Sequence, residues 1–253
     1  MNFEELKKLY IETVMSEMMD WHNDKYVQFS EVKKLFLSCY KGILNLSRNC
    51  SESIKTCWDN HQNAMFPSNV FNLIFEIDNE DFLTAASFNP LTSPYELCVN
   101  CTMFKKDKDL SRLLKFLETD NFKVLLAHEI CHLCQTKTYG ASYMKKHIEK
   151  ENNGQYDSSI VELEACLFML IESASLKRKK LKDSNDVFRY AESNDNSFLQ
   201  HASEMVLKNK SDVLNILEHN DNFLTEANEF AEEESFEMMF DPNNCIPVPF
   251  KRK

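Results

Sequence analysis

The sequence predicts an α+β protein that is mostly helical, with a small central β-sheet and added helices at both ends. Three observations predict this class. Apolar residues recur at steps of three and four over most of the chain, which is the period of a helix with one buried face. Between residues 70 and 100 the pattern changes to β-branched and aromatic residues that partly alternate with polar ones. Glycine occurs only 3 times in 253 residues, which excludes turn-dense β folds and glycine-rich phosphate loops, because both need residues without a Cβ.

The first 65 residues are expected to be helical. Leu6 and Leu9 begin an apolar stripe, a second helical stretch starts at Ser30, and a third, shorter one covers residues 51–61. Pro67 marks the end of this part, since a proline interrupts both helices and central strands.

The predicted sheet follows. Residues 70–77 have the clearest strand pattern, and residues 82–88 and 95–100 are weaker strand candidates. Asn-Pro and Ser-Pro dipeptides separate them, as is typical of turns. We therefore expect a sheet of three or four strands.

Helical periodicity resumes at about Asp109 and again over residues 122–135. The polar segment at residues 136–159 is long for a structureless connection, so we expect a lid or a short helix within it. Ser158 or Ser159 is expected to cap a strong helix, because a serine oxygen accepts from the first backbone N–H groups. Beyond this helix, the remainder reads as three or four short helices.

Charge and composition exclude several partners. The net charge of −11 makes the chain a poor ligand for nucleic acid or an anionic membrane. The longest apolar run, residues 165–171, is too short to span a bilayer, and the first 21 residues lack the apolar core of a signal peptide. The 9 cysteines are an odd number, so we expect reduced thiols and a cytoplasmic protein.

The motif His128-Glu129-x-x-His132 carries the chemistry. On a helix, residues four apart lie on one face, so the two imidazoles can close on one Zn²⁺. Glu129, next to the first histidine, is suited to take a proton from the attacking water. The spacing therefore predicts zinc ligands at His128 and His132, with Glu129 as the general base.

A third ligand is needed. Gln135 and Thr138 stand where the metzincin motif requires glycine and histidine, so that class is excluded. A gluzincin takes a glutamate from a later helix. Glu162 is favoured, because it begins a strong helix and a ligand should project from a rigid element. Glu151, in a polar stretch, and Glu164, about 200° around the helix from Glu162, remain alternatives.

These residues resemble a known family. The motif L-A-H-E-I-C-H at residues 126–132, followed by E-x-x-A-C-x-F-M at residues 162–169, is similar to that of the ImmA/IrrE-type metallopeptidases. Their pattern is roughly l-A-H-E-[IL]-G-H followed by E-x-x-A-N-x-F-A. Cys131, Cys166 and Met169 replace the glycine, the asparagine and the last alanine of that pattern.

The resemblance covers residues 95–175 and implies a minimal gluzincin. It implies that His128, His132 and Glu162 bind zinc, that Glu129 is the general base, and that an edge strand of the sheet holds the substrate. We expect that edge near residues 97–100. Members of the family often carry a helix-turn-helix domain, and this sequence shows none.

A donor for the transition state is expected in the segment that could fold over the cleft. The candidates are Tyr139, Tyr143, His147 and Tyr156.

The cysteines offer a rival metal site. Cys98 with Cys101 and Cys131 with Cys134 form two C-x-x-C pairs, the spacing of a structural zinc site. The second pair lies inside an apolar helix pattern without a glycine turn, which argues against a zinc knuckle. Buried, inert thiols are the favoured interpretation for Cys39, Cys131 and Cys166, and a nucleophilic Cys131 or Cys134 is a minor alternative.

The sequence therefore predicts a zinc metalloendopeptidase that cuts a protein or peptide substrate. Its core is expected at residues 67–182, between helical regions at residues 1–66 and 183–253. The alternative is a non-enzymatic helical module, zinc-containing or a degenerate protease, that binds a protein partner. In either case the terminal helices are candidate surfaces for a regulatory protein. The acidic stretch at residues 221–240 is interpreted first as a solvated helix face and second as a partner-binding surface.

Overall fold

A computed structural model describes residues 26–67, 71–77, 86–89, 92, 95–101, 110–152, 159–220, 223–226, 243 and 245–249. The helices are α2 (Phe29–Asn49), α3 (Ser51–Asp59), α5 (Leu110–Leu117), α6 (Asp120–Tyr139), α7 (Ala141–Asn152), α8 (Ile160–Leu176), α9 (Ser184–Glu192), α10 (Gln200–Lys208), α11 (Lys210–Glu218) and α12 (Phe223–Glu226), with a 3₁₀ turn η2 (Ser197–Leu199). The strands are β1 (Gln62–Phe66), β2 (Phe71–Glu76), β3 (Ala86–Asn89), β4 (Tyr95–Asn100) and β5 (Ile246–Pro249). The predicted class, α+β and mostly helical with a small sheet, is confirmed.

The sheet is mixed and has the order β3-β4-β2-β1-β5. β2 and β4 are parallel, and the other neighbours are antiparallel. Two expectations about it were wrong. The described sheet has 5 strands rather than three or four, because β5, near the C-terminus, pairs with β1. Residues 97–100 are not an edge, because β4 is paired on one side with β2 and on the other with β3.

The N-terminal helices end earlier than the sequence suggested. α3 stops at Asp59, and His61 takes a left-handed conformation with φ of 56°. The chain then enters β1, whose Ala64 and Phe66 are fully buried against the sheet. Residues 62–65 were therefore wrongly expected to be helical, since pairing with β2 outweighs a weak local preference.

Other local expectations are confirmed. Ser159 caps α8, because its hydroxyl accepts from the Val161 N–H at 3.2 Å. The polar segment after α6 contains the expected short helix, α7, which follows Gly140 at a φ of 83°. The described residues of the C-terminal part include four short helices, α9 to α12. Expectations for residues 1–25, 82–85 and 153–158 lie outside the described residues, as does most of the acidic stretch.

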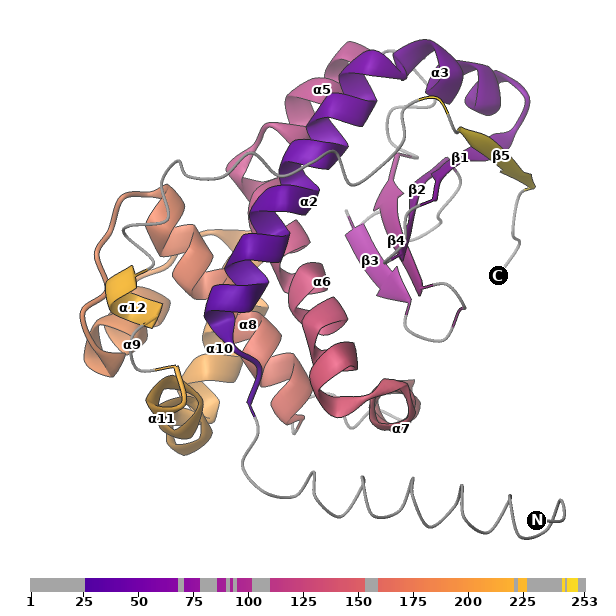
Figure 1. Ribbon diagram of the computed structural model, residues 1–253. Helices are drawn as coiled ribbons and strands as arrows, with labels where there is room; N and C mark the ends of the chain where they lie inside the picture. The colour runs from indigo at the N-terminus through magenta and orange to yellow at the C-terminus, as the bar shows by residue number, and fades with distance from the viewer. Residues whose placement is uncertain are drawn as a thin grey trace, which may run out of the picture.

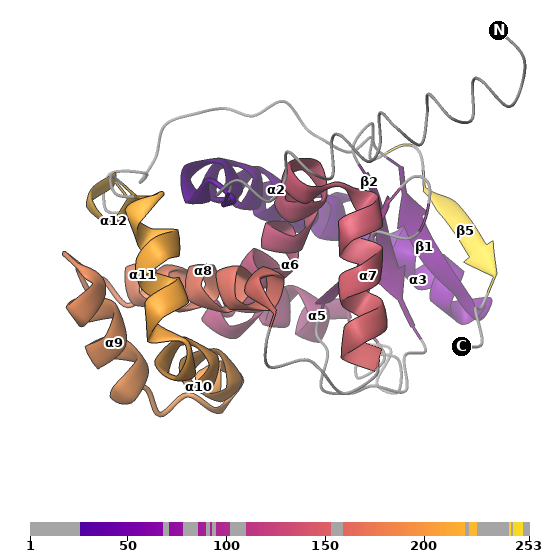
Figure 2. The ribbon, with the colours of Figure 1, turned by 90° about the horizontal axis from the view of Figure 1, so that it is seen from below.

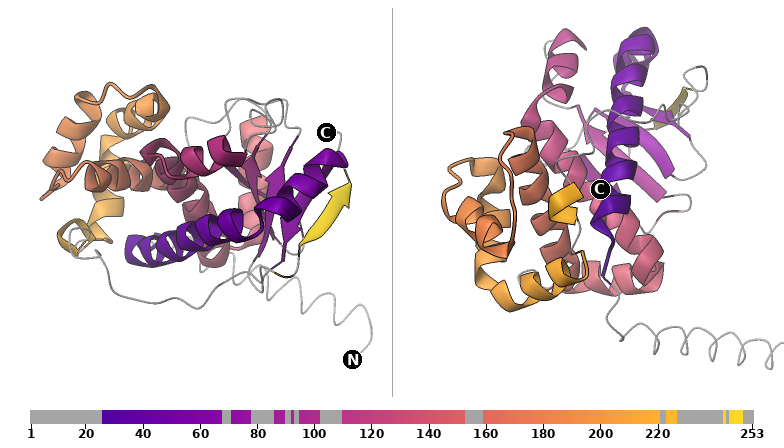
Figure 3. Two further views of the ribbon diagram at one scale, coloured as in Figure 1. Left: turned by 90° about the horizontal axis from the view of Figure 1, so that it is seen from above. Right: turned by 60° about the vertical axis from the view of Figure 1, so that its left-hand side comes forward.

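The elements form two parts on either side of a central helix group. α2, α6 and α8 lie in the middle, the sheet lies on one side of them, and α9 to α12 lie on the other (Figures 1 and 3). α6 and α8 cross in contact, and α7 lies between them and the sheet side in the view from below (Figure 2). None of the described helices combines the length and apolar character that crossing a bilayer requires.

One hydrophobic core joins all three predicted regions. It includes Phe29 of α2, Leu126 of α6, Phe168 of α8 and Val206 of α10. The buried Asn220 adds polar contacts, because its side chain accepts from the Phe29 N–H at 2.7 Å and donates to a backbone carbonyl at residue 27. The division at residues 66/67 and 182/183 stays a prediction about the chain, since the core itself is shared.

Candidate metal centre

α6 presents the H-E-x-x-H motif from a well-anchored helix. Thr119 caps its N-terminus by accepting from the Phe122 N–H at 3.2 Å, and Gly140 ends it. Buried residues of the intervening turn, such as Ile130 and Cys131, fix the rotation of the helix in the core. The sequence folds this way because apolar residues surround the motif and must be covered.

The two histidines and Glu162 meet where α6 packs on α8. His128 Nε2 and His132 Nε2 are 3.0 Å apart. Glu162 Oε1 lies 3.3 Å from His128 Nε2, and Glu162 Oε2 lies 3.4 Å from His132 Nε2. The structure therefore brings together the three residues that the sequence singled out as ligands.

These distances fit a tetrahedral zinc ion. With zinc–nitrogen and zinc–oxygen bonds of about 2.0–2.2 Å, two ligands of a tetrahedron lie about 3.3–3.6 Å apart. The two histidine–glutamate distances, 3.3 Å to Oε1 and 3.4 Å to Oε2, lie in that range, and each is measured to a different oxygen of the carboxylate. The histidine–histidine distance of 3.0 Å is slightly shorter, as suits a hydrogen bond between the two rings. Two imidazole nitrogens and a carboxylate are also the donor set that zinc prefers.

The electrostatics of the group favour a cation. Burial opposes the charged form of His132, but the hydrogen bond and charge of Glu162, together with Glu129 and Gln135, outweigh it and raise the pKa of His132 to about 9. Glu162 itself is 1% exposed, so its carboxylate is held in the core next to the rings. A buried carboxylate needs such a partner, and a proton or a metal ion can supply the positive charge.

Glu129 lies beside the group and contacts the sheet. Its Oε2 accepts from the backbone N–H of Phe88 in β3 at 2.8 Å. β3 is the last strand of the described sheet on the α6 side, so the motif glutamate connects the helix to the sheet edge (Figure 1). This contact fixes one carboxylate oxygen and thereby the orientation of the other.

A polar network lies behind His132. The His132 Nδ1 atom is 2.7 Å from Gln135 Oε1. The Gln135 amide donates to the Val161 carbonyl at 2.6 Å and to Glu164 Oε2 at 2.9 Å. Tyr139 and the Val27 N–H both donate to Glu164 Oε1, at 2.7 and 2.9 Å. Glu164 is therefore satisfied within the protein and holds Gln135, which orients the His132 ring.

The alternative third ligands separate clearly. Glu164 faces Tyr139 and Gln135 instead of the histidine pair, as its position about 200° around the helix from Glu162 predicts. Burial raises the pKa of Glu164 to about 7, against the lowering effect of its three donors. The side chain of Glu151 lies outside what the structure describes.

Two candidate transition-state donors have structural partners. The Tyr139 hydroxyl donates to Glu164, and His147 Nδ1 lies 2.6 Å from the hydroxyl of the capping Ser159. Tyr143 is half-buried, with its ring 5.4 Å from that of Tyr139. Tyr156 lies outside the described residues. A donor role for any of these four residues stays a prediction.

Cys166 belongs to this centre, which sequence reasoning missed. Its thiol donates to Glu162 Oε1 at 3.5 Å, and His128, Glu162 and Cys166 each offer a ligand atom within 4.8 Å of the others. Burial and the charge of Glu162 raise the pKa of the Cys166 thiol well above its usual value. The four-residue step from Glu162 to Cys166, which equals that of the histidines, was a signal that could have found it.

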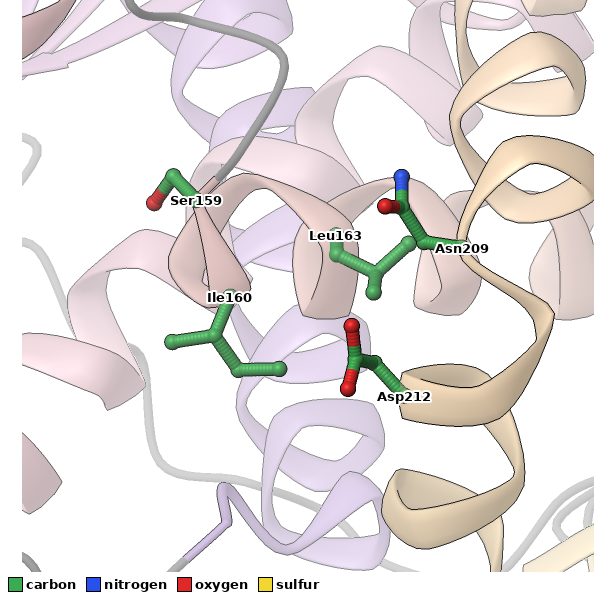
Figure 4. Close-up of a pocket in the computed structure, with 5 residues that line it drawn as sticks. All are labelled: Ser159, Ile160, Leu163, Asn209 and Asp212. Atoms are coloured by element: carbon green, nitrogen blue, oxygen red, sulfur yellow. The ribbon is translucent and has the colours of Figure 1, made fainter.

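The rival cysteine site does not form. Among the described residues, which include all four cysteines of the C-x-x-C pairs, the group that could hold a metal ion is that of His128, Glu162 and Cys166. A small cavity of about 140 Å³ lies between the N-terminal turn of α8 and the N-terminal turn of α11. Its lining, Ser159, Ile160, Leu163, Asn209 and Asp212, has no imidazole or thiol and is separate from the centre (Figure 4).

Comparisons with models of protein families, with curated proteins and with solved structures found no match.

Proposed function

We propose that the protein is a zinc-dependent metallopeptidase of the gluzincin type, which hydrolyses a peptide bond in a protein substrate. The observation that carries the proposal is the convergence of His128, His132 and Glu162, whose ligand atoms lie 3.0–3.4 Å apart, with Glu129 beside them. A structural zinc site has no need of a general base next to its ligands. The resemblance of the two motifs to ImmA/IrrE-type metallopeptidases supports the same conclusion.

Each side chain has a part in this mechanism. His128, His132 and Glu162 would hold the ion, which when bound polarises the scissile carbonyl and activates water. Glu129 Oε2 accepts from Phe88, so its Oε1 is the atom that takes the proton from water and returns it to the leaving amine. Gln135 forms a hydrogen bond with His132 Nδ1 and so orients the ring, with its Nε2 atom toward Glu162.

We propose that the substrate peptide binds at the outer edge of β3. Alternate residues of a strand direct their backbone groups to opposite edges, and Phe88 directs its N–H away from β4, toward Glu129. Ala86 shares that direction, so a peptide adding as a strand would pair with Ala86 and with the Phe88 carbonyl, while the Phe88 N–H stays on Glu129. The first expectation, an edge near residues 97–100, is replaced by β3.

We also propose a cytoplasmic location and a protein partner for the terminal helices. None of the 9 cysteines, all within the described residues, takes part in a disulfide, which agrees with a reducing compartment. The acidic composition argues against nucleic acid as the partner.

Metal analysis tests the proposal first. Purified wild type should contain about one equivalent of zinc by mass spectrometry, as expected for one three-ligand site. The His128→Ala/His132→Ala double variant should contain none. Zinc retained in the double variant, or no zinc in wild type after supplementation, would contradict the proposed centre.

Activity then separates an enzyme from a binding module. Glu129→Gln should keep the metal and lose about 10²–10⁴-fold in peptide hydrolysis, the usual contribution of a general base. The assay is cleavage of a peptide library read by mass spectrometry. Glu204→Gln is the matched control, because Glu204 is exposed on α10 and accepts only from Gln200 among its recorded contacts. Equal and measurable cleavage by Glu129→Gln and wild type would contradict the role of Glu129 as the general base.

A further inference from the structure

Two helices each contribute a pair of metal-ligating side chains, four residues apart, to the contact between α6 and α8. α6 contributes His128 and His132, and α8 contributes Glu162 and Cys166. Glu162 and Cys166 are both 1% exposed, so the second pair lies wholly inside the α6–α8 contact. The proposed peptidase uses only three of these four side chains and leaves the thiol without a role.

The position of the thiol fits ligation as well as hydrogen bonding. With a zinc–sulfur bond of about 2.3 Å and a zinc–oxygen bond of about 2.0–2.2 Å, sulfur and oxygen ligands of a tetrahedron lie about 3.5–3.7 Å apart. The Cys166 Sγ to Glu162 Oε1 distance is 3.5 Å. The ligand atom of His128 is within 4.8 Å of both, so His128, Glu162 and Cys166 lie within reach of one ion, and His132 Nε2 lies 3.4 Å from the other oxygen of Glu162.

The fourth position decides how a zinc site behaves. Structural sites have four protein ligands, whereas catalytic sites leave one position for water or substrate. A thiolate in that position would exclude both. A thiol that ligates a dication binds as the thiolate, and its proton passes to solvent.

We propose that Cys166 is the fourth protein ligand of the zinc ion and holds the peptidase in a latent, closed state. This inference rests on the proposed zinc centre. Hydrolysis then requires the thiolate to leave the ion or the ion to accept a fifth ligand. The thiolate also makes the site select soft borderline metals such as zinc and cobalt over magnesium or calcium.

Cobalt substitution tests this with a readout that does not depend on catalysis. The full chain is stripped of metal and loaded with Co²⁺, and the absorption spectrum is recorded for wild type, Cys166→Ser and Cys131→Ser. Visible ligand-field bands report cobalt in the centre, and a near-ultraviolet charge-transfer band reports a cobalt–thiolate bond. Cys131 is the matched control, because it is a fully buried cysteine on α6 between the two histidines.

The expected result is a charge-transfer band in wild type and Cys131→Ser that is lost in Cys166→Ser. Ligand-field bands without a charge-transfer band in wild type would overturn the inference and leave the proposed function intact. A band that Cys131→Ser removes and Cys166→Ser keeps would also overturn it. Failure of wild type to bind cobalt or zinc at all would overturn both the inference and the proposed function.

A second measurement needs no variant, in case Cys166→Ser fails to fold. X-ray absorption of zinc-loaded wild type should show one sulfur at about 2.3 Å together with nitrogen and oxygen ligands. A shell of nitrogen and oxygen alone would overturn the inference. Where Cys166→Ser does fold, it should keep zinc and cleave the peptide library faster than wild type, and unchanged or slower cleavage with full zinc would contradict the latent state.

Discussion

The first turns of α8 and its C-terminal part both bury glutamates, but they pair them with different groups. Near the N-terminus Glu162 faces two imidazoles and a thiol, and Glu164 faces a tyrosine hydroxyl, an amide and a backbone N–H. Toward the C-terminus Glu172 forms a buried ion pair with Lys33 of α2. All three carboxylates are at most 3% exposed.

The two regions differ in whether the partners of the buried glutamate can bind a metal ion. Glu172 forms an ion pair with a lysine, and Glu164 accepts hydrogen bonds from three donors. Neither set of partners includes an imidazole or a thiol that could bind a metal ion. The imidazoles and the thiol around Glu162 can give up protons to a metal ion. Burial of an acid therefore does not mark a metal site by itself, and the chemistry of its neighbours does.

The largest expected change in stability concerns the ion pair at the C-terminal part of α8. Lys33→Met leaves the Glu172 carboxylate buried without its cation, which should lower the free energy of unfolding by about 3–5 kcal/mol in urea titrations. The double variant Lys33→Met/Glu172→Met should recover most of that loss, because two apolar side chains replace the pair. A single variant within about 1 kcal/mol of wild type, the worth of an exposed pair, would show that the pair is not needed.

A smaller change in stability, together with zinc content, should distinguish Glu162 from Glu164 in the first turns of α8. Glu164→Gln removes an acceptor from its three donors and should lower the free energy of unfolding by about 2 kcal/mol, while zinc content stays near that of wild type. Glu162→Gln should instead lose zinc. The two variants are compared by metal analysis and urea titration side by side. Loss of zinc in Glu164→Gln but not in Glu162→Gln would reverse the assignment of the third ligand.

The smallest expected effect is on the link between these acids. Gln135→Ala breaks the connection from Glu164 to the Nδ1 atom of His132 and should weaken zinc binding about tenfold, or about 1.4 kcal/mol. A competition titration with a fluorescent chelator measures it. Gln200→Ala, an exposed residue of α10, serves as control and should bind zinc like wild type. Equal affinity in Gln135→Ala and wild type would show that the network supports only the fold.

Several features were accessible from the sequence because they depend on local spacing. The helical class, the start of α8 at Ser159 and the facing positions of His128 and His132 follow from helical periodicity and capping. Glu162 was favoured for its place in a strong helix, and the opposite direction of Glu164 follows from two steps of about 100°.

Tertiary structure alone decided how these local pieces meet. β5 pairs with β1, although most of the chain separates them in sequence. β4 lies inside the sheet and not at its edge. Both results depend on long-range strand pairing, which local patterns do not encode. The placement of Cys166 at the histidines depends on how α8 is rotated against α6. By itself the sequence determined a helix with a metal-binding motif and a second helix rich in buried acids. Only packing decided which acid and which thiol reach the histidines, since side chains on one helix can face any neighbour until the core fixes its rotation.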